Sequence, residues 1–148
     1  MKLFNNIIFR IAIILFFMNS CDQKPPLETP NIVFILTDDL GFQDLSSYGS
    51  PMIKTPNLDL LAKQGALLNS YYSTQAVCSA SRASILTGAY PNRIGFSGAL
   101  GPNSKKGINS NELLMSEMLK GQGYKTAIYG KWHLGDNAPA RPMDKGFE

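Results

Sequence analysis

Short apolar runs rich in β-branched and aromatic residues alternate along this chain with segments that have the features of short helices. Runs of this length and composition favour strands buried in a sheet. Pro56 opens one helical segment and Gly65 follows it, which is typical of a short helix. The expected elements, in chain order, are strand 31–36, helix 56–64, strand 66–72, helix 79–87, helix 111–120 and strand 124–129. This alternation predicts an α/β fold.

The third expected helix has a candidate capping box at its start. Asn109 and Glu112 stand ahead of Leu113 and Leu114, in the spacing by which two side chains satisfy free backbone N–H groups reciprocally. We therefore expect this helix to begin near residue 111.

Two neighbouring carboxylates follow the first expected strand, where Asp38 and Asp39 precede Leu40 and Gly41. Ligand sites of open α/β sheets gather beyond the carboxyl ends of the strands. Adjacent carboxylates repel one another unless a cation lies between them, and hard oxygen ligands suit calcium or magnesium. The alternative is a simple turn, since Asp and Gly are common turn formers. The residues alone leave both interpretations open.

A candidate reactive centre lies at the start of the second expected helix. The chain reads Cys-Ser-Ala-Ser-Arg from Cys78 to Arg82, followed by a short apolar run. If a helix begins just after Cys78, its free backbone N–H groups and its dipole would face a bound anion. The alternative is structural, because a lone Cys is usually a small buried hydrophobe and an Arg is usually solvated.

A second cluster of polar residues follows the last expected strand, in the segment Gly-Lys-Trp-His-Leu-Gly that begins at Gly130. Lys131 and His133 are two positions apart, so on an extended chain they would point to the same side and share one pocket. His133 is the only His in the chain. A single His is more often a structural hydrogen-bonding group than a catalyst, and the residues alone leave both interpretations open.

Together, these three segments resemble the signatures of the type I, formylglycine-dependent sulfatases. Segments 55–65 and 87–95 also match, as scaffold, so the resemblance extends from residue 31 to residue 148. It implies the alkaline-phosphatase-like fold, a large mixed sheet between helices, of which this chain would be the N-terminal portion. One departure is Ala80, where the commonest family core has Pro, and this bears on recognition by the maturation enzyme.

The resemblance also implies the chemistry of the site. Cys78 would be oxidised to formylglycine by a formylglycine-generating enzyme, and the hydrated aldehyde would attack the sulfur of a sulfate ester. Asp38 and Asp39 would hold Ca²⁺, or alternatively Mg²⁺, together with the modified Cys78.

Three further residues have implied roles in the same family. Arg82 would stabilise the deprotonated aldehyde hydrate, Lys131 would bind a sulfate oxygen, and His133 would help to expel sulfate. The implied substrates are sulfate esters, with sulfated glycans as a candidate class. Ligands that the family supplies further along its sequence have no counterpart here, so we expect an N-terminal fragment that is inactive alone.

The amino terminus resembles an export signal. Lys2 precedes, and Arg10 interrupts, an apolar stretch from Leu3 to Met18 that is short for a membrane span. Cys21 follows this stretch in a context like that of a bacterial lipoprotein, so we expect cleavage before Cys21, lipidation of its thiol and a membrane anchor in the periplasm or at the cell surface. Simple secretion is the alternative. The expected organisation is signal peptide 1–20, tether 21–30 and partial catalytic domain 31–148.

Charge and cysteine content exclude other functions. The formal net charge is +3, and without the signal the chain has 12 basic against 11 acidic residues. No basic block suggests nucleic acid as a partner. The chain has two Cys, and a disulfide between them would consume both proposed functional groups, so we rank it as the lesser alternative.

Two rival functions stay open at this level. A phosphomonoesterase or phosphonate monoester hydrolase of the same superfamily would use a similar metal site. A surface lipoprotein that binds sulfated glycan without turnover would need none of the catalytic groups.

Overall fold

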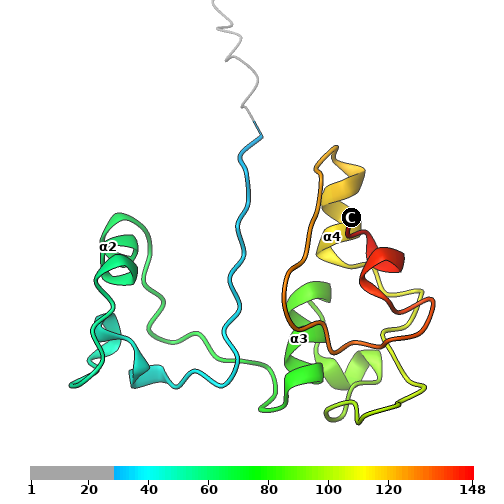
Figure 1. Ribbon diagram of the computed structural model, residues 1–148, viewed down its shortest axis with the longest axis horizontal. Helices are drawn as coiled ribbons and strands as arrows, with labels where there is room; N and C mark the ends of the chain where they lie inside the picture. The colour runs from blue at the N-terminus through cyan, green and yellow to red at the C-terminus, as the bar shows by residue number, and fades with distance from the viewer. Residues whose placement is uncertain (1–28) are drawn as a thin grey trace, which may run out of the picture. The chain divides into compact units, whose positions relative to one another are not determined.

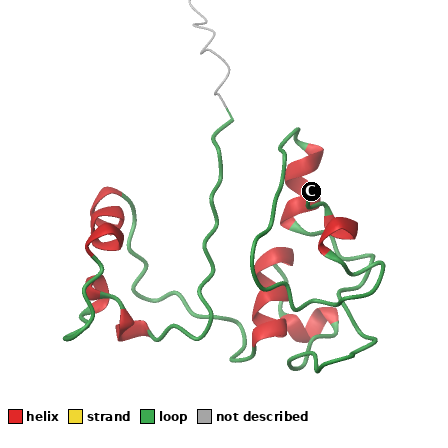
Figure 2. Ribbon diagram, in the orientation of Figure 1, coloured by secondary structure: helices red, strands yellow, loops and turns green. Residues whose placement is uncertain are grey.

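The computed structural model describes residues 29–148, and the chain divides after Leu36 into two units. Figure 1 traces the described chain, and Figure 2 shows that its regular elements are helices. The α-helices are α2 (Pro56–Gln64), α3 (Cys78–Thr87) and α4 (Met115–Gly121), and 3₁₀ turns lie at Phe42–Asp44, Ser46–Tyr48, Pro91–Ile94 and Pro142–Lys145. The expected signal segment and Cys21 lie outside the described residues. Within residues 29–148, no helix is both long enough and apolar enough to cross a membrane.

Helices α2 and α3 confirm two sequence predictions. α2 has Pro56 in its first turn and the predicted bounds. α3 begins at Cys78, one residue earlier than predicted, and ends at Thr87. Gly88 caps it with a φ of 68°, the left-handed conformation that commonly terminates helices. Pro56 and Gly65 therefore predicted α2 correctly, and the predicted range of α3 is also close to the observed one.

The predicted start of α4 is wrong. The helix begins at Met115, and the Glu117 carboxylate accepts the N–H of Leu114 at 2.9 Å. Asn109 instead accepts the N–H of Asn111 at 2.9 Å, and its carbonyl accepts the N–H of Glu112. The Asn109 side chain thus closes a turn of its own, a competing use of this residue type.

The three predicted strands are also wrong for the described chain, since residues 29–148 contain no strand (Figure 2). A strand exists only when a neighbouring strand satisfies its backbone groups. Residues 31–36 are exposed and have no such neighbour among the described residues. In segment 124–129, the carbonyl of Thr126 accepts the N–H of Glu148 at 2.8 Å, and the Thr126 hydroxyl donates to the carbonyl of Gly146. These contacts hold the C-terminal residues against segment 124–129, but they do not form the repeated backbone hydrogen bonds of a β-sheet.

The core forms where small residues of α3 meet the chain that follows it. Ala80 and Ala83 are fully buried, as are Leu114 and Leu134. The remaining buried apolar residues are Phe96, Ile108 and Ala140. The N–H of Ile108 donates to the carbonyl of Leu134 at 2.7 Å, which joins the chain before α4 to the loop that carries the second predicted cluster.

Close approach of two glycines makes that junction feasible. A Cβ on Gly135 would lie 2.8 Å from the Cα of Gly107, and Gly135 has a φ of 120°. Glycine is needed here because a side chain would collide with backbone. Trp132 closes the same loop, because its indole N–H donates to the carbonyls of Gly135 at 3.1 Å and Ala140 at 2.9 Å.

Lys145 fastens the C-terminal segment to the chain before α4. Its side chain is 2% exposed, and its Nζ donates to the carbonyls of Glu112 at 2.8 Å and Ser110 at 3.3 Å. The Glu117 carboxylate lies 3.6 Å away. These partners compensate the charge that burial would otherwise penalise.

Candidate active site

Asp38 brings together residues from three of the predicted segments. Its Oδ1 accepts a hydrogen bond from Nη2 of Arg82 at 3.1 Å, and its Oδ2 accepts one from Nζ of Lys131 at 3.0 Å. Arg82 also donates from Nη1 to the carbonyl of Lys131 at 2.6 Å. Charge-assisted hydrogen bonds of this kind are stronger than neutral ones and fix geometry. Two cations and one carboxylate therefore share a single cluster.

The cluster changes the titration of its members. Hydrogen bonds from Lys131 and then from Arg82 hold the pKa of the Asp38 carboxyl below its ordinary value. The hydrogen bond to Asp38 raises the pKa of the Lys131 ammonium, and the attraction between the two charges adds to this effect. The ion pair with Asp38 therefore favours the cationic form of Lys131.

Cys78 occupies the first position of α3, as a half-buried free thiol. Val77, at the N-cap, has no side-chain oxygen, so no side chain caps the first turn of the helix. The free N–H groups and the positive end of the helix dipole are therefore available to an anion beside Cys78. Arg82, one turn further along α3, has a buried Nε without a hydrogen-bond partner within the described part of the chain. Such unsatisfied groups call for an explanation, and a bound ligand is one.

His133 makes its own contact with the chain after α3. Its φ is 60°, in the left-handed region, and its Nε2 is 2.8 Å from the carbonyl of Leu100. The backbone at His133 is thus not extended, and the sharing of one pocket by Lys131 and His133 stays a prediction. Gly130, with a φ of 96°, makes the turn that precedes Lys131. The Nδ1 of His133 is buried and has no partner among residues 29–148.

Asp39 follows Asp38 with a φ of 54°, a conformation that Asp adopts more readily than most residues. Asp38 and Asp39 carry the hard oxygen atoms that a divalent cation prefers. However, residues 29–148 contain no group of three or more His, Cys, Asp or Glu side chains placed to hold a metal. Both oxygens of Asp38 are also engaged by Arg82 and Lys131. The described residues alone therefore do not form a complete metal site.

Ser79 is a residue whose part in the site the sequence did not indicate. Its hydroxyl is fully buried, and its Oγ accepts the N–H of Leu100 at 3.0 Å. The partner is a backbone group on a residue 21 positions away, which leaves no signature in the sequence. The only available signal was the hydroxyl itself, at a helix position that faces the core.

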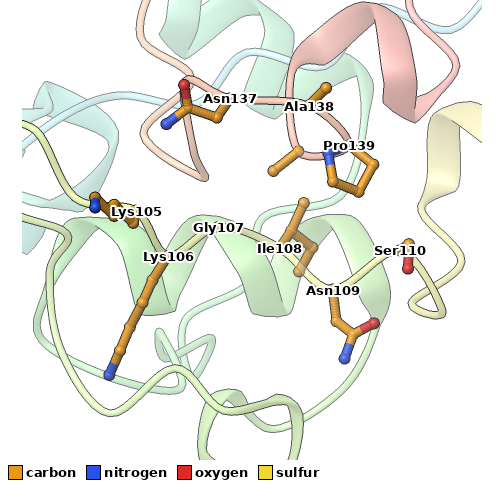
Figure 3. Close-up of a pocket in the computed structure, with 10 residues that line it drawn as sticks. Lys105, Lys106, Gly107, Ile108, Asn109, Ser110, Asn137, Ala138 and Pro139 are labelled. Carbon is orange, nitrogen blue, oxygen red and sulfur yellow. The ribbon is translucent and has the colours of Figure 1, made fainter.

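A pocket of about 180 Å³ lies elsewhere in the same unit, between residues 105–110 and residues 137–140. Figure 3 shows Asn137 and Pro139 on one side of it and Lys106 and Asn109 on the other. None of the predicted site residues lines this pocket. The residues around Asp38 are thus a separate cluster.

Comparison with known proteins identifies the family. The family profile described as Sulfatase matches residues 30–148. The chain is 43% identical to N-acetylgalactosamine-6-sulfatase of Sus scrofa over 82% of this chain and 25% of that protein. It is 49% identical to arylsulfatase A of Bos taurus over 72% of this chain and 21% of that protein. The chain thus spans about a quarter of the length of these relatives.

A solved structure gives the same result for the fold. The crystal structure of Ps i-CgsB matches with a TM-score of 0.73 and 38% identity, over 75% of this chain and 25% of that chain. Ps i-CgsB has also been solved in complex with k-i-k-neocarrahexaose. Over the matched residues, the backbone follows that of the corresponding part of an alkaline-phosphatase-like protein. Because the profile covers most of its length, the chain belongs to the sulfatase family.

Proposed function

We propose that this protein hydrolyses sulfate monoesters, with a formylglycine made from Cys78 as the source of the nucleophile. The observation that carries the proposal is the convergence of Arg82 and Lys131 on Asp38, next to a free cysteine at an uncapped helix start. A sulfate ester is anionic, and its transition state spreads negative charge over oxygen atoms, much as in phosphoryl transfer. Positioned positive charge is therefore the main requirement.

The position of Cys78 fits the modification. The side chain is small, half-buried and free of a disulfide, and it lies at the first position of α3. When present, the formylglycine would supply a hydrated aldehyde hydroxyl that can attack sulfur. The first-turn N–H groups of α3 would orient the anionic ester beside position 78.

Each neighbouring residue has a separate role in the proposal. Arg82 provides a fixed positive charge one helical turn from Cys78, and its unpartnered Nε is free to donate to an oxygen atom of the ligand. Lys131 provides a second cation, kept protonated by Asp38. His133 would accept or return a proton near the reacting centre.

A divalent cation, calcium or alternatively magnesium, is part of the proposal. Asp38 and Asp39 would supply two carboxylates to it, and the modified Cys78 a third oxygen ligand. Such a cation would have to share Asp38 with Arg82 and Lys131, which now engage both of its oxygens. The roles given above for the side chains do not depend on the metal.

The substrate class that we propose is a sulfated glycan. The support is indirect: Ps i-CgsB, which shares this fold, was solved with k-i-k-neocarrahexaose. The matched relatives are sulfatases, which favours sulfate over phosphate esters and turnover over binding alone. We also propose that a formylglycine-generating enzyme acts on the chain during export, and that lipidation of Cys21 anchors the product to a membrane.

The mass of the tryptic peptide 64–82, taken from protein made in its native host, tests the nucleophile. Conversion replaces the CH₂–SH group of Cys78 with an aldehyde, so we expect the mass of the peptide to fall by the corresponding difference. An intact thiol in all of the material would contradict the formylglycine proposal and would leave Ala80 as the first residue to suspect.

Substitution of Arg82 tests the electrostatic part of the proposal. In a protein that joins this chain to the downstream part of a sulfatase, which supplies the family's remaining ligands, Arg82→Ala should lower kcat/KM toward an aryl sulfate by roughly 10²- to 10³-fold. This is the usual effect of removing one group that stabilises transition-state charge. Arg93→Ala is the matched control, because Arg93 is exposed and lies outside the cluster. Equal losses in both variants would contradict the role of Arg82. Faster hydrolysis of an aryl phosphate than of the aryl sulfate by the unsubstituted protein would contradict the preference for sulfate esters.

A further inference from the structure

The backbone of Leu100 connects the start of α3 with His133. Its N–H donates to Oγ of Ser79 at 3.0 Å, and its carbonyl is 2.8 Å from Nε2 of His133. Ser79 directly follows Cys78 and is fully buried, whereas His133 is half-buried. A single loop residue thus joins the neighbour of the proposed nucleophile to the only imidazole in the chain.

The contact with Leu100 decides which nitrogen of His133 carries a proton. A carbonyl oxygen only accepts hydrogen bonds, so Nε2 must be the donor. In the neutral imidazole the other nitrogen then has a free lone pair. That nitrogen, Nδ1, is buried and has no partner within the described residues. A buried lone pair without a donor is costly unless something else comes to use it.

We infer that Ser79 is a positioning residue that acts through Leu100 to hold His133 as the Nε2–H tautomer, so that Nδ1 is the nitrogen that exchanges protons with the reacting group. This inference rests on the proposed function for the use of Nδ1, but not for the tautomer. Ser79 fixes the Leu100 N–H, the Leu100 carbonyl then fixes Nε2–H, and the lone pair of Nδ1 is left available. Neither Ser79 nor Leu100 touches the reacting atoms.

The alternative explanation is that the Ser79 hydroxyl only satisfies a backbone N–H in the core. Ser84 provides the matched control, since it lies on the same helix and its side chain is also buried, at 6% exposed. Its hydroxyl donates to the carbonyl of Ser81 at 2.8 Å and accepts from Thr74 at 2.6 Å. No contact connects it with Leu100 or His133 in the described chain.

Nitrogen-15 NMR of the full chain, labelled on histidine and recorded at about pH 8, where an imidazole is ordinarily neutral, tests the inference. One His gives one pair of ring signals, and the two tautomers have distinct shifts. We expect the signal of a protonated nitrogen at Nε2 and that of an unprotonated nitrogen at Nδ1. A dominant Nδ1–H tautomer, or an imidazolium, in the unsubstituted chain would overturn the inference.

The role of Ser79 is tested by substitution. Ser79→Ala should reduce the ratio of the Nε2–H to the Nδ1–H tautomer about fivefold, which corresponds to the loss of one typical hydrogen bond. Ser84→Ala should leave the ratio unchanged. Equal spectra for the two variants would overturn the role of Ser79.

If Ser79→Ala does not fold, Ser79→Cys provides the same test, because the thiol is nearly the same size and is a weak acceptor. The ratio should then fall in the same direction, and an unchanged ratio overturns the role of Ser79. Neither measurement requires conversion of Cys78 or turnover. An unmodified thiol in the peptide 64–82 would therefore contradict the proposed nucleophile without affecting the result for the His133 tautomer.

Discussion

Residues 42–65 and residues 78–148 differ in what holds them together. In the second region, apolar side chains from α3 and the loops after it are buried against one another. In the first region no apolar side chain is buried, and the polar groups of Ser46, Thr55 and Asp59 bond to one another instead. Figure 1 shows the chain of each region around its own helices. One region is stabilised by the hydrophobic effect and the other by a small hydrogen-bonded network.

The difference shows what each sequence pattern requires from its surroundings. The apolar face of α2 includes Leu58 and Leu61, which are 44% and 63% exposed. Leu134, in the second region, is fully buried. Similar side chains thus contribute to stability only where the neighbouring segments supply a surface to pack on.

The largest expected effect comes from deleting packing in the second region. Leu134→Ala should lower the free energy of unfolding by about 3 kcal/mol, because it removes buried methyl groups and leaves a cavity. Leu61→Ala, which removes the same atoms from an exposed site, should change the free energy by less than about 0.5 kcal/mol. Urea denaturation of both variants makes the measurement. Similar midpoints would mean that the contrast between the regions does not describe the folded chain.

A smaller effect is expected from the polar network of the first region. Asp59 accepts from the hydroxyls of Ser46 at 2.6 Å and Thr55 at 3.2 Å, so Asp59→Ala should lower local stability by about 1–2 kcal/mol. The loss should appear as faster hydrogen exchange in α2, with exchange in α3 unchanged. Asp136→Ala is the control, since Asp136 is exposed. Faster exchange in α3 as well would indicate that the two regions unfold as one unit.

The smallest effect should come from a surface ion pair in the second region. Arg141 donates from Nε and Nη2 to the two oxygens of Asp144, each at 2.9 Å, and these hydrogen bonds hold the pKa of Asp144 below its ordinary value of 3.8. A carboxyl group with a lower pKa in the folded than in the unfolded chain stabilises the folded state at pH values above its pKa in the unfolded chain. This stabilisation is lost as the pH falls through its pKa in the folded chain.

Thermal unfolding at about pH 6 and about pH 3 measures that contribution. The drop in Tm between the two should be slightly smaller for Asp144→Asn than for the unsubstituted chain, because the variant has no carboxylate to protonate. A larger drop in the variant would contradict the assigned sign.

Helices and site members were predictable to different degrees from the sequence. Pro56 and Gly65 mark the ends of α2 by local geometry, and α2 and α3 were both predicted almost to the residue. The strands were not, because a strand depends on a partner segment that its own residues do not specify. The sequence assigned Asp38, Arg82 and Lys131 to one site, and the structure brings them together, although as an ion-pair cluster rather than a metal shell.

The contacts of His133 could not have been predicted. Its partner is a backbone carbonyl 33 positions away, and every residue type carries such a group. The left-handed φ of His133 is also a property of the folded loop that its residue type does not specify.

The burial of Lys145 gives the chain a built-in chemical reporter. The other lysines of the described residues are exposed, whereas this one is 2% exposed and its amine is engaged by backbone carbonyls. An amine-reactive acylating reagent should therefore modify the exposed lysines quickly and reach Lys145 only when the C-terminal segment opens. The acylation rate at this one side chain, read by peptide mass, would report on how often that end of the molecule detaches from the chain before α4.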